Sequence, residues 1–162
     1  MVEFVRMSKD DFDKYLSYIT KNYADEKAKA GNWSRENAFE LAKQTIHKLL
    51  PDGIDTERHY IYSIYNNSDQ IGTLWFKLNE QQDSSKTAFL YDIFIYKGYQ
   101  GKGYGEQTMK KFEDKAKELK CDRISLHVFA HNNPAISLYK KMGCKITNLV
   151  MSKEILKNGI TA

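Results

Sequence analysis

The chain has 162 residues, of which 41% are hydrophobic and 28% are charged, so we expect one globular domain over residues 1–162. A formal net charge of +4 is too small to indicate a nucleic-acid partner by itself. Two cysteines favour a reducing, cytoplasmic location, and the sequence has no apolar run near the ~20 residues that a membrane span needs.

The hydrophobic pattern of the first half predicts a strand, two helices and a hairpin. A short strand near residues 3–7 precedes a helix capped by Ser8, and a loop or broken helix is expected near residues 24–33. A second helix should start after Ser34 and stop at Pro51. Strand patterns follow at 59–65, 71–78 and 87–96, and the last of these is apolar enough to lie centrally in a sheet.

The second half alternates helices and strands. A helix follows the glycines near residue 105, a strand is expected over 123–130, a short helix over 133–143 and a final strand over 144–155. The order is therefore β-α-α-β-β-β-α-β-α-β. The connection from 87–96 to 123–130 is long enough for a right-handed parallel crossover. We predict an α/β fold with a mixed sheet and helices on both faces.

The stretch QGKGYGEQ, residues 100–107, places three glycines between a strand and a helix. Glycines at a helix entrance expose backbone N–H groups, and the helix dipole adds partial positive charge there, so the stretch predicts an anion site. A Walker A loop is excluded because no Ser or Thr follows Lys102, and the GxGxG spacing differs from the GxGxxG of dinucleotide folds. A pyrophosphate loop of the form [Arg/Gln]-x-x-Gly-x-[Gly/Ala] fits Gln100 to Gly105, whereas a plain strand–helix turn would need only one glycine.

A second motif, HNNPAISLYKKMGC, follows about thirty residues later. Together, the two motifs resemble the GCN5-related N-acetyltransferase (GNAT) superfamily over residues 87–147. The second motif matches the family's N-x-x-A-x-x-L-Y-x-x-x-G segment, with Asn132, Ala135, Leu138, Tyr139 and Gly143 at its fixed positions. Two departures stand out. Gln100 replaces the Arg of many members, and Cys144 replaces Phe or Tyr.

The resemblance implies a GNAT-like fold in which the central parallel strands splay apart to hold acetyl-CoA. It further implies direct transfer of an acetyl group from acetyl-CoA to a primary amine in a ternary complex, without a metal. Ile95 is expected to offer its backbone N–H to the thioester oxygen. The cofactor-binding residues implied are Ile93, Phe94, Ile95, Gln100, Gly101, Lys102, Gly103, Tyr104, Gly105, Glu106 and Asn132.

Two residues are candidates for proton transfer. By resemblance, Tyr139 is the general acid for the leaving thiolate, although its place on an apolar helix stripe also fits a core residue. Asp92 lies within the apolar strand FLYDIFIY, where an acid is costly to bury without a partner or a role. It is a candidate base or, equally, a structural acid. His127, His131 and a water-mediated base are weaker alternatives.

The acceptor site is the least defined part of the sequence. Tyr91, Tyr23, Glu26 and Trp33 are candidate substrate contacts, and the acceptor is either a small-molecule or a peptide amine. A noncatalytic acyl-CoA-binding sensor of the same fold is the alternative function. A nucleic-acid partner is not expected because basic and acidic residues alternate in KKFEDKAKELK. The assembly state stays open, with a homodimer as one option.

Overall fold

The computed structural model describes residues 1–156 and contains a five-stranded sheet in the order β1-β2-β3-β4-β5. The first four strands pair antiparallel, and β4 pairs parallel with β5. The strands are β1 (Val2–Arg6), β2 (His59–Asn66), β3 (Asp69–Glu80), β4 (Lys86–Ile95) and β5 (Arg123–Leu126). The helices are α1 (Lys9–Lys29), α2 (Arg35–Leu49), α3 (Tyr104–Glu118) and α4 (Asn133–Lys141), with short 3-10 turns at Gly53–Asp55 and Lys97–Tyr99.

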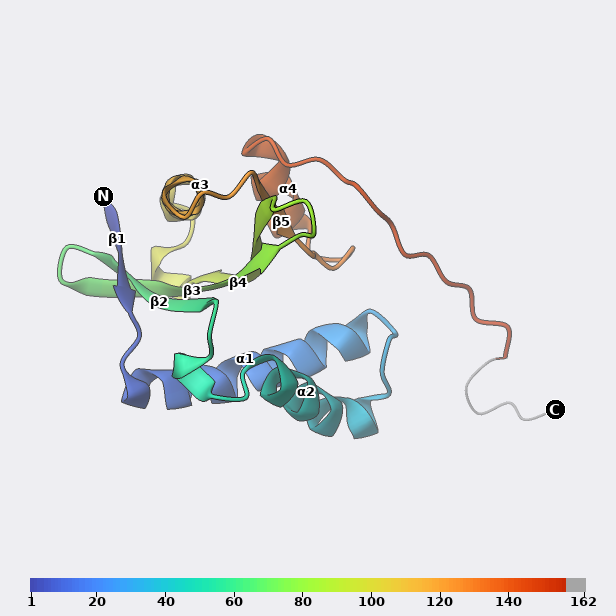
Figure 1. Cartoon of the computed structure of the whole chain (residues 1–162). Helices are drawn as coiled ribbons and strands as arrows, with labels where there is room; N and C mark the ends of the chain where they lie inside the picture. The colour runs from blue at the N-terminus through green and yellow to red at the C-terminus, as the bar shows by residue number, and fades with distance from the viewer. Residues whose placement is uncertain (157–162) are drawn as a thin grey trace.

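Helices cover both faces of the sheet, as predicted: α1 and α2 lie on one side, and α3 and α4 on the other (Figure 1). Neighbouring residues on β3 pack on opposite faces of the sheet because successive strand side chains point in opposite directions. Phe76 is fully buried on the α3 side, with its ring 4.9 Å from that of Phe112. Trp75 is buried in the cluster formed with α1 and α2. The central strands are thus anchored from both sides.

Helix α1 continues to Lys29, so the loop or broken helix predicted near residues 24–33 begins later than expected and lies between Lys29 and Arg35. Its start is as expected, with the Ser8 side chain accepting a hydrogen bond from the Asp11 N–H at 3.1 Å. The stretch after residue 23 lacks large apolar residues, but its alanines favour helix and fit a close helix–helix contact. Ala24 is buried in a small cluster with Ala38 and Ala42 of α2.

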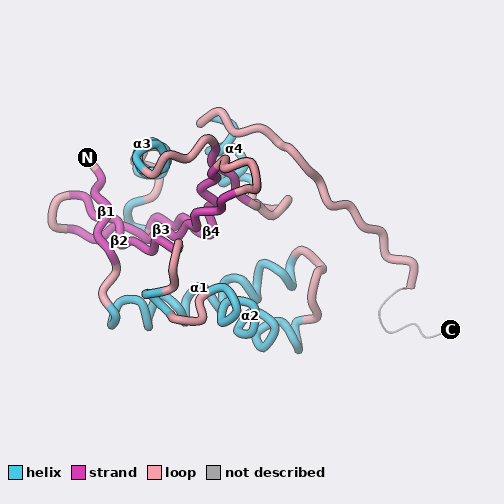
Figure 2. Tube along the Cα trace, viewed as in Figure 1, coloured by secondary structure: helices cyan, strands magenta, loops and turns pink. Residues whose placement is uncertain are grey.

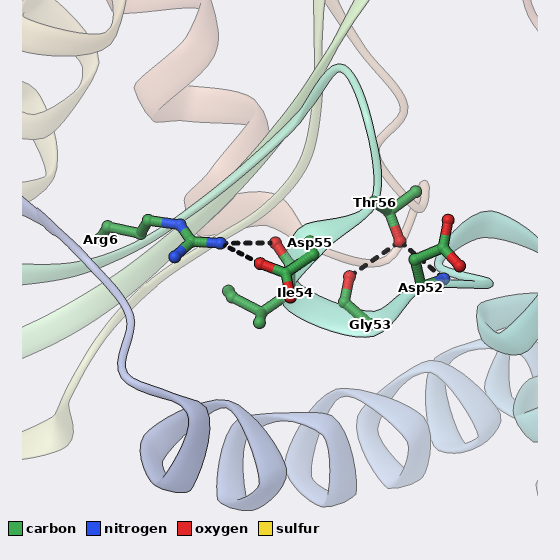
Figure 3. A network of polar contacts seen from close by, with 6 residues as sticks. All are labelled: Arg6, Asp52, Gly53, Ile54, Asp55 and Thr56. Atoms are coloured by element: carbon green, nitrogen blue, oxygen red, sulfur yellow. Dashed lines mark hydrogen bonds and ion pairs between the residues drawn. The ribbon is translucent and has the colours of Figure 1, made fainter.

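A surface network fixes the turn that leads from α2 into β2 (Figure 3). The Arg6 guanidinium at the end of β1 donates to the Asp55 carboxylate at 2.6 Å and to the Ile54 carbonyl at 3.4 Å. The Thr56 hydroxyl donates to the Gly53 carbonyl at 2.8 Å. Both charged side chains are mostly exposed, so the ion pair orients the turn more than it stabilises the fold.

The last predicted strand is absent. Within the described residues, 144–156 form no strand; they run away from the sheet as an extended segment (Figures 1 and 2). Gly143 ends α4 with φ +92°, and the Cys144 N–H donates to the Tyr139 carbonyl at 2.9 Å. A strand pattern is not enough to form a strand, because a strand also needs a hydrogen-bonded neighbour. The strand predicted over 123–130 is likewise shorter and stops at Leu126.

Candidate active site

A cleft of about 910 Å³ opens where β4 and β5 diverge. The two strands pair only from Thr87 to Leu90 and from Arg123 to Leu126. Beyond that point, residues 91–95 and 127–129 form separate walls of the cleft. The predicted splaying of the central parallel strands is confirmed. Helix α1, the glycine loop, the start of α3 and helix α4 supply the other walls.

The glycine loop forms one end of the cleft. Gly101 and Gly103 adopt left-handed φ angles of +76° and +84°, and an added Cβ at either would meet nothing within 4 Å. Gly103 is the N-cap residue of α3, and no side chain accepts a hydrogen bond from this end of the helix. Within residues 1–156, no backbone carbonyl accepts from the N–H groups of residues 101–106. The loop therefore presents free donors at a helix N-terminus.

Two polar side chains of the loop are turned toward the protein. The Gln100 side chain donates to the Ile95 carbonyl at 2.7 Å, which ties the loop to the end of β4. The Lys102 ammonium lies 5.8 Å from the centre of the Tyr99 ring. Lys102 is exposed, so its side chain can also reach an anion at the loop.

Helices α3 and α4 meet closely beside the loop. A Cβ on Gly105 would lie 3.3 Å from a methyl carbon of Leu138, so there is little room for a side chain between the two helices. Glu106 and Lys141 form an ion pair between the two helices, and Lys141 lowers the pKa of Glu106. Asn132 caps α4, its side-chain oxygen accepting from the Ala135 N–H at 3.3 Å. Asn132 also lines the cleft, as do Tyr104 and Gly105.

A β-bulge sets the direction of Asp92. Trp75 pairs with Asp92, but the next residue, Phe76, pairs with Leu90, so Tyr91 is the extra residue. Bulges of this kind re-aim side chains and are frequent next to active sites. Asp92 and Tyr91 both line the cleft. The Tyr91 ring stacks on that of Trp75 with centroids 4.5 Å apart.

The Asp92 carboxylate is partly open to the cleft but closely surrounded by protein atoms. It accepts a hydrogen bond from the Tyr15 hydroxyl at 2.8 Å. Burial raises the pKa of Asp92 to about 6, against the opposing effect of this hydrogen bond. A carboxyl with this pKa is mostly ionised at neutral pH, yet it can bind a proton readily.

Tyr139 lies on α4 and also lines the cleft. Burial, followed by the charge of Asp92, raises the pKa of its hydroxyl well above the usual value. Tyr139 is therefore protonated at neutral pH. The two residues proposed for proton transfer thus face one cavity from different elements, β4 and α4.

The predicted acceptor residues divide into two groups. Tyr23 and Glu26 of α1 line the cleft, whereas Trp33 is not among its lining residues. Trp33 packs edge-on against Tyr23, and the Lys27 ammonium lies 5.2 Å from the centre of a Trp33 ring. Glu26 is 2.7 Å from His131, a contact that links α1 to the segment between β5 and α4.

Sequence reasoning missed two residues of α1 at the cleft, Tyr15 and Tyr18. Tyr15 binds Asp92 and lies three residues after Phe12 on the same apolar stripe, so its spacing could have placed it inward. Tyr18 lines the cleft directly, and so does His127, which the sequence had indicated only as a weaker candidate base. Burial lowers the pKa of His127, which keeps its ring neutral at physiological pH.

The structure adds two observations on membranes and metals. Among the helices of residues 1–156, none is both long and apolar enough to cross a membrane. In the same range, no three His, Cys, Asp or Glu side chains gather as a metal site would require.

Comparison with known proteins gives a consistent picture. The model of the Acetyltransferase (GNAT) family matches residues 16–144. An uncharacterized N-acetyltransferase of Bacillus subtilis, YycN, is 41% identical over 92% of this chain and 96% of its own length. The crystal structure of YycN has a TM-score of 0.91 and covers 97% of this chain and 100% of its own.

Two further relatives are more distant. A second uncharacterized Bacillus subtilis N-acetyltransferase, YdgE, is 33% identical over 92% of this chain and 95% of its own length. A spermine/spermidine N(1)-acetyltransferase of Bacillus subtilis is 34% identical over 54% of this chain and 61% of its own length. By the extent of these matches, the chain belongs to the GNAT family of acetyltransferases and is an N-acetyltransferase.

Proposed function

We propose that this protein transfers an acetyl group from acetyl-CoA to a primary amine by direct attack within a ternary complex. The observation that carries the proposal is the pairing of Asp92, with its pKa raised to about 6, and protonated Tyr139 in one cleft. A base and an acid whose environments hold them in opposite protonation states are what acyl transfer to an amine requires.

The glycine loop fits the diphosphate of acetyl-CoA. Its free N–H groups at residues 101–106 and the positive end of α3 suit an anion, and Lys102 adds a formal charge. When bound, acetyl-CoA supplies the activated acetyl thioester. The edge of β4 that faces the cleft has no partner strand beyond Leu90 within the described residues, so the main chain of residues 93–95 is free to pair with an amide-bearing arm.

The proposed reaction transfers one acetyl group and two protons: the amine loses one proton and the leaving thiolate gains one. The amine nitrogen attacks the thioester carbonyl carbon, the new C–N bond forms, and the C–S bond breaks. Asp92 takes the proton that the amine nitrogen loses, directly or through one water. The Tyr139 hydroxyl gives its proton to the leaving thiolate. A backbone N–H of residues 93–95 stabilises the carbonyl oxygen as it gains negative charge.

The acceptor enters from the α1 side. Tyr18, Tyr23 and Glu26 line this part of the cleft, and they offer aromatic faces and one carboxylate. These groups suit a cationic amine. The partial similarity to a spermine/spermidine N(1)-acetyltransferase supports testing polyamines first.

The test is a turnover assay that follows thiol release from acetyl-CoA with spermidine, an aminoglycoside, a small amine and a lysine peptide. We expect turnover with at least one amine and a higher melting temperature when acetyl-CoA is added. A rise in melting temperature without turnover on any amine would favour the noncatalytic sensor. No rise at millimolar acetyl-CoA would overturn the cofactor assignment.

A further inference from the structure

The carboxylate of Asp92 is held by a tyrosine from the helix layer. The Tyr15 hydroxyl of α1 donates to Asp92 Oδ2 at 2.8 Å, across 77 positions of sequence. Tyr15 is only 5% exposed and packs in the cluster that α1 and α2 form against the sheet. Because the donor is fixed by this packing, the hydrogen bond fixes one oxygen of the carboxylate. The other oxygen, Oδ1, is left for the cleft that Asp92 lines.

A second hydroxyl near the carboxylate, that of Thr73 on β3, does not replace Tyr15. Burial raises the pKa of Asp92, and the hydroxyls of Tyr15 and Thr73 oppose this effect, Tyr15 more strongly. The Thr73 side chain is buried, and its hydroxyl has no hydrogen-bond partner within residues 1–156. Tyr15 is therefore the donor that orients Asp92.

The titratable groups that face Asp92 in the described part of the chain are tyrosines. Tyr15 and Tyr18 come from α1 and Tyr139 comes from α4, and burial, followed by the charge of Asp92, raises the pKa of each hydroxyl. All three tyrosines are therefore protonated at neutral pH. Asp92 is the group of this cluster that titrates near neutrality, so the donors around it determine how much of it is ionised.

We propose that Tyr15 is a positioning residue for acetyl transfer: its hydroxyl holds Asp92 in the orientation and the ionised state in which Oδ1 accepts the proton of the amine. The inference rests on the proposed function, in which Asp92 is the base. Tyr15 is not among the residues that line the cleft, so it acts through Asp92. Once Oδ1 carries the proton, Oδ2 is a carbonyl oxygen and still accepts the Tyr15 hydrogen bond, so the donor need not move during the step.

The first test is the pH profile of Tyr15→Phe, which keeps the buried ring and removes the donor. A hydrogen bond to a charged group is equivalent to about one to two pH units, so the acid limb of kcat/KM should move upward by this amount from about pH 6. At pH 7 the variant should be about 2–10-fold slower than the native protein, and the ratio should approach one at pH 9, where both carboxyls are ionised. Tyr60→Phe is the matched control, because the Tyr60 ring stacks on Phe76 in the cluster on the α3 side and does not line the cleft.

The second test does not depend on turnover. The carboxyl carbon of Asp92, assigned as the NMR signal that Asp92→Asn lacks, is titrated in each protein. Its midpoint should rise by about one to two pH units in Tyr15→Phe and stay unchanged in Tyr60→Phe. In the Asp92→Asn background, Tyr15→Phe should change kcat by less than about twofold, because Tyr15 acts through Asp92.

The outcomes separate this inference from the proposed function. If the native protein turns over no amine, the proposed function fails and the role of Tyr15 fails with it. If the native protein is active but the Asp92 midpoint does not move in Tyr15→Phe, the inference alone is overturned. A rate ratio between variant and native protein that stays constant from pH 6 to pH 9 would overturn it as well, because a purely structural loss does not follow the ionisation of Asp92.

Discussion

Replacing Asp92 with Asn distinguishes a catalytic base from a structural carboxylate, because the two roles predict opposite changes in stability. The carboxyl pKa rises from 3.8 to about 6 on folding, mainly because of burial. At 1.36 kcal/mol per unit, ionised Asp92 costs the folded state about 3 kcal/mol above pH 6. An Asn side chain removes this cost and can still accept the Tyr15 hydrogen bond, which is 2.8 Å long in the native protein.

We therefore expect Asp92→Asn to be more stable than the native protein at pH 8, by up to about 3 kcal/mol, or roughly 6–12 °C in melting temperature. The pH dependence has a definite sign. The folded-state pKa is raised, so the native protein loses stability relative to the variant as pH rises from 3.8 to about 6. Below 3.8 the carboxyl is protonated in both states and the difference vanishes.

The same variant should lose activity. Without the carboxylate, turnover should fall by roughly 10²-fold or more, and the native kcat/KM should decline below about pH 6 with unit slope. Thermal melting at pH 4, 5, 6 and 8, together with initial rates, measures both effects. Asp114→Asn is the control, because Asp114 is an exposed acid on α3. A variant that melts lower than the native protein at pH 8 and keeps its turnover would refute the reasoning and make Asp92 a structural acid.

Three other substitutions test separate parts of the site. Tyr139→Phe should lower kcat by roughly 10²-fold with little change in acetyl-CoA affinity, and an unchanged kcat would remove its role as the acid. Gly103→Ala should weaken acetyl-CoA binding in calorimetry at a folding cost of about 1 kcal/mol, because an added Cβ would strain the left-handed backbone, whose φ is +84°, and project from the loop. Gly98→Ala is the control, because Gly98 has no left-handed φ and its substitution should leave binding normal. Gly72→Ala would place a Cβ 2.1 Å from the Phe94 carbonyl oxygen, so it should destabilise the sheet by more than about 3 kcal/mol, and a melting temperature within 2 °C of native would contradict the close approach.

Local sequence was sufficient for the features that depend on neighbouring residues. The glycine spacing predicted a strand–loop–helix unit, and the structure has left-handed Gly101 and Gly103 leading into α3. Asn132, a fixed position of the second motif, caps α4. In contrast, the break predicted near residues 24–33 starts only after Lys29, because small alanine side chains give no clear hydrophobic pattern over the last turns of α1. Ala24 is buried only because helix α2 packs closely against this part of α1.

The environment of Asp92 could not be predicted in this way. Its orientation depends on a bulge that is visible only in the register between β3 and β4. Its hydrogen-bond partner, Tyr15, is 77 residues away in the sequence. The sequence pattern could only indicate that an acid in an apolar strand is costly to bury without a partner or a role. The pairing of β4 with β3 and the contact with α1 determine how deeply its carboxyl is buried and which group binds it.

The cleft and the open edge of β5 share one structural cause. Strands β4 and β5 stop pairing after Leu90 and Leu126, so residues 127–129 have no strand partner on either side within the described chain. On the inner side, this gap opens the cleft between the strands. On the outer side, it leaves residues 127–129 held only through β5 before them and α4 after them. A substitution that loosens this wall, far from Asp92, should therefore raise the KM for acetyl-CoA before it changes the chemistry at Tyr139.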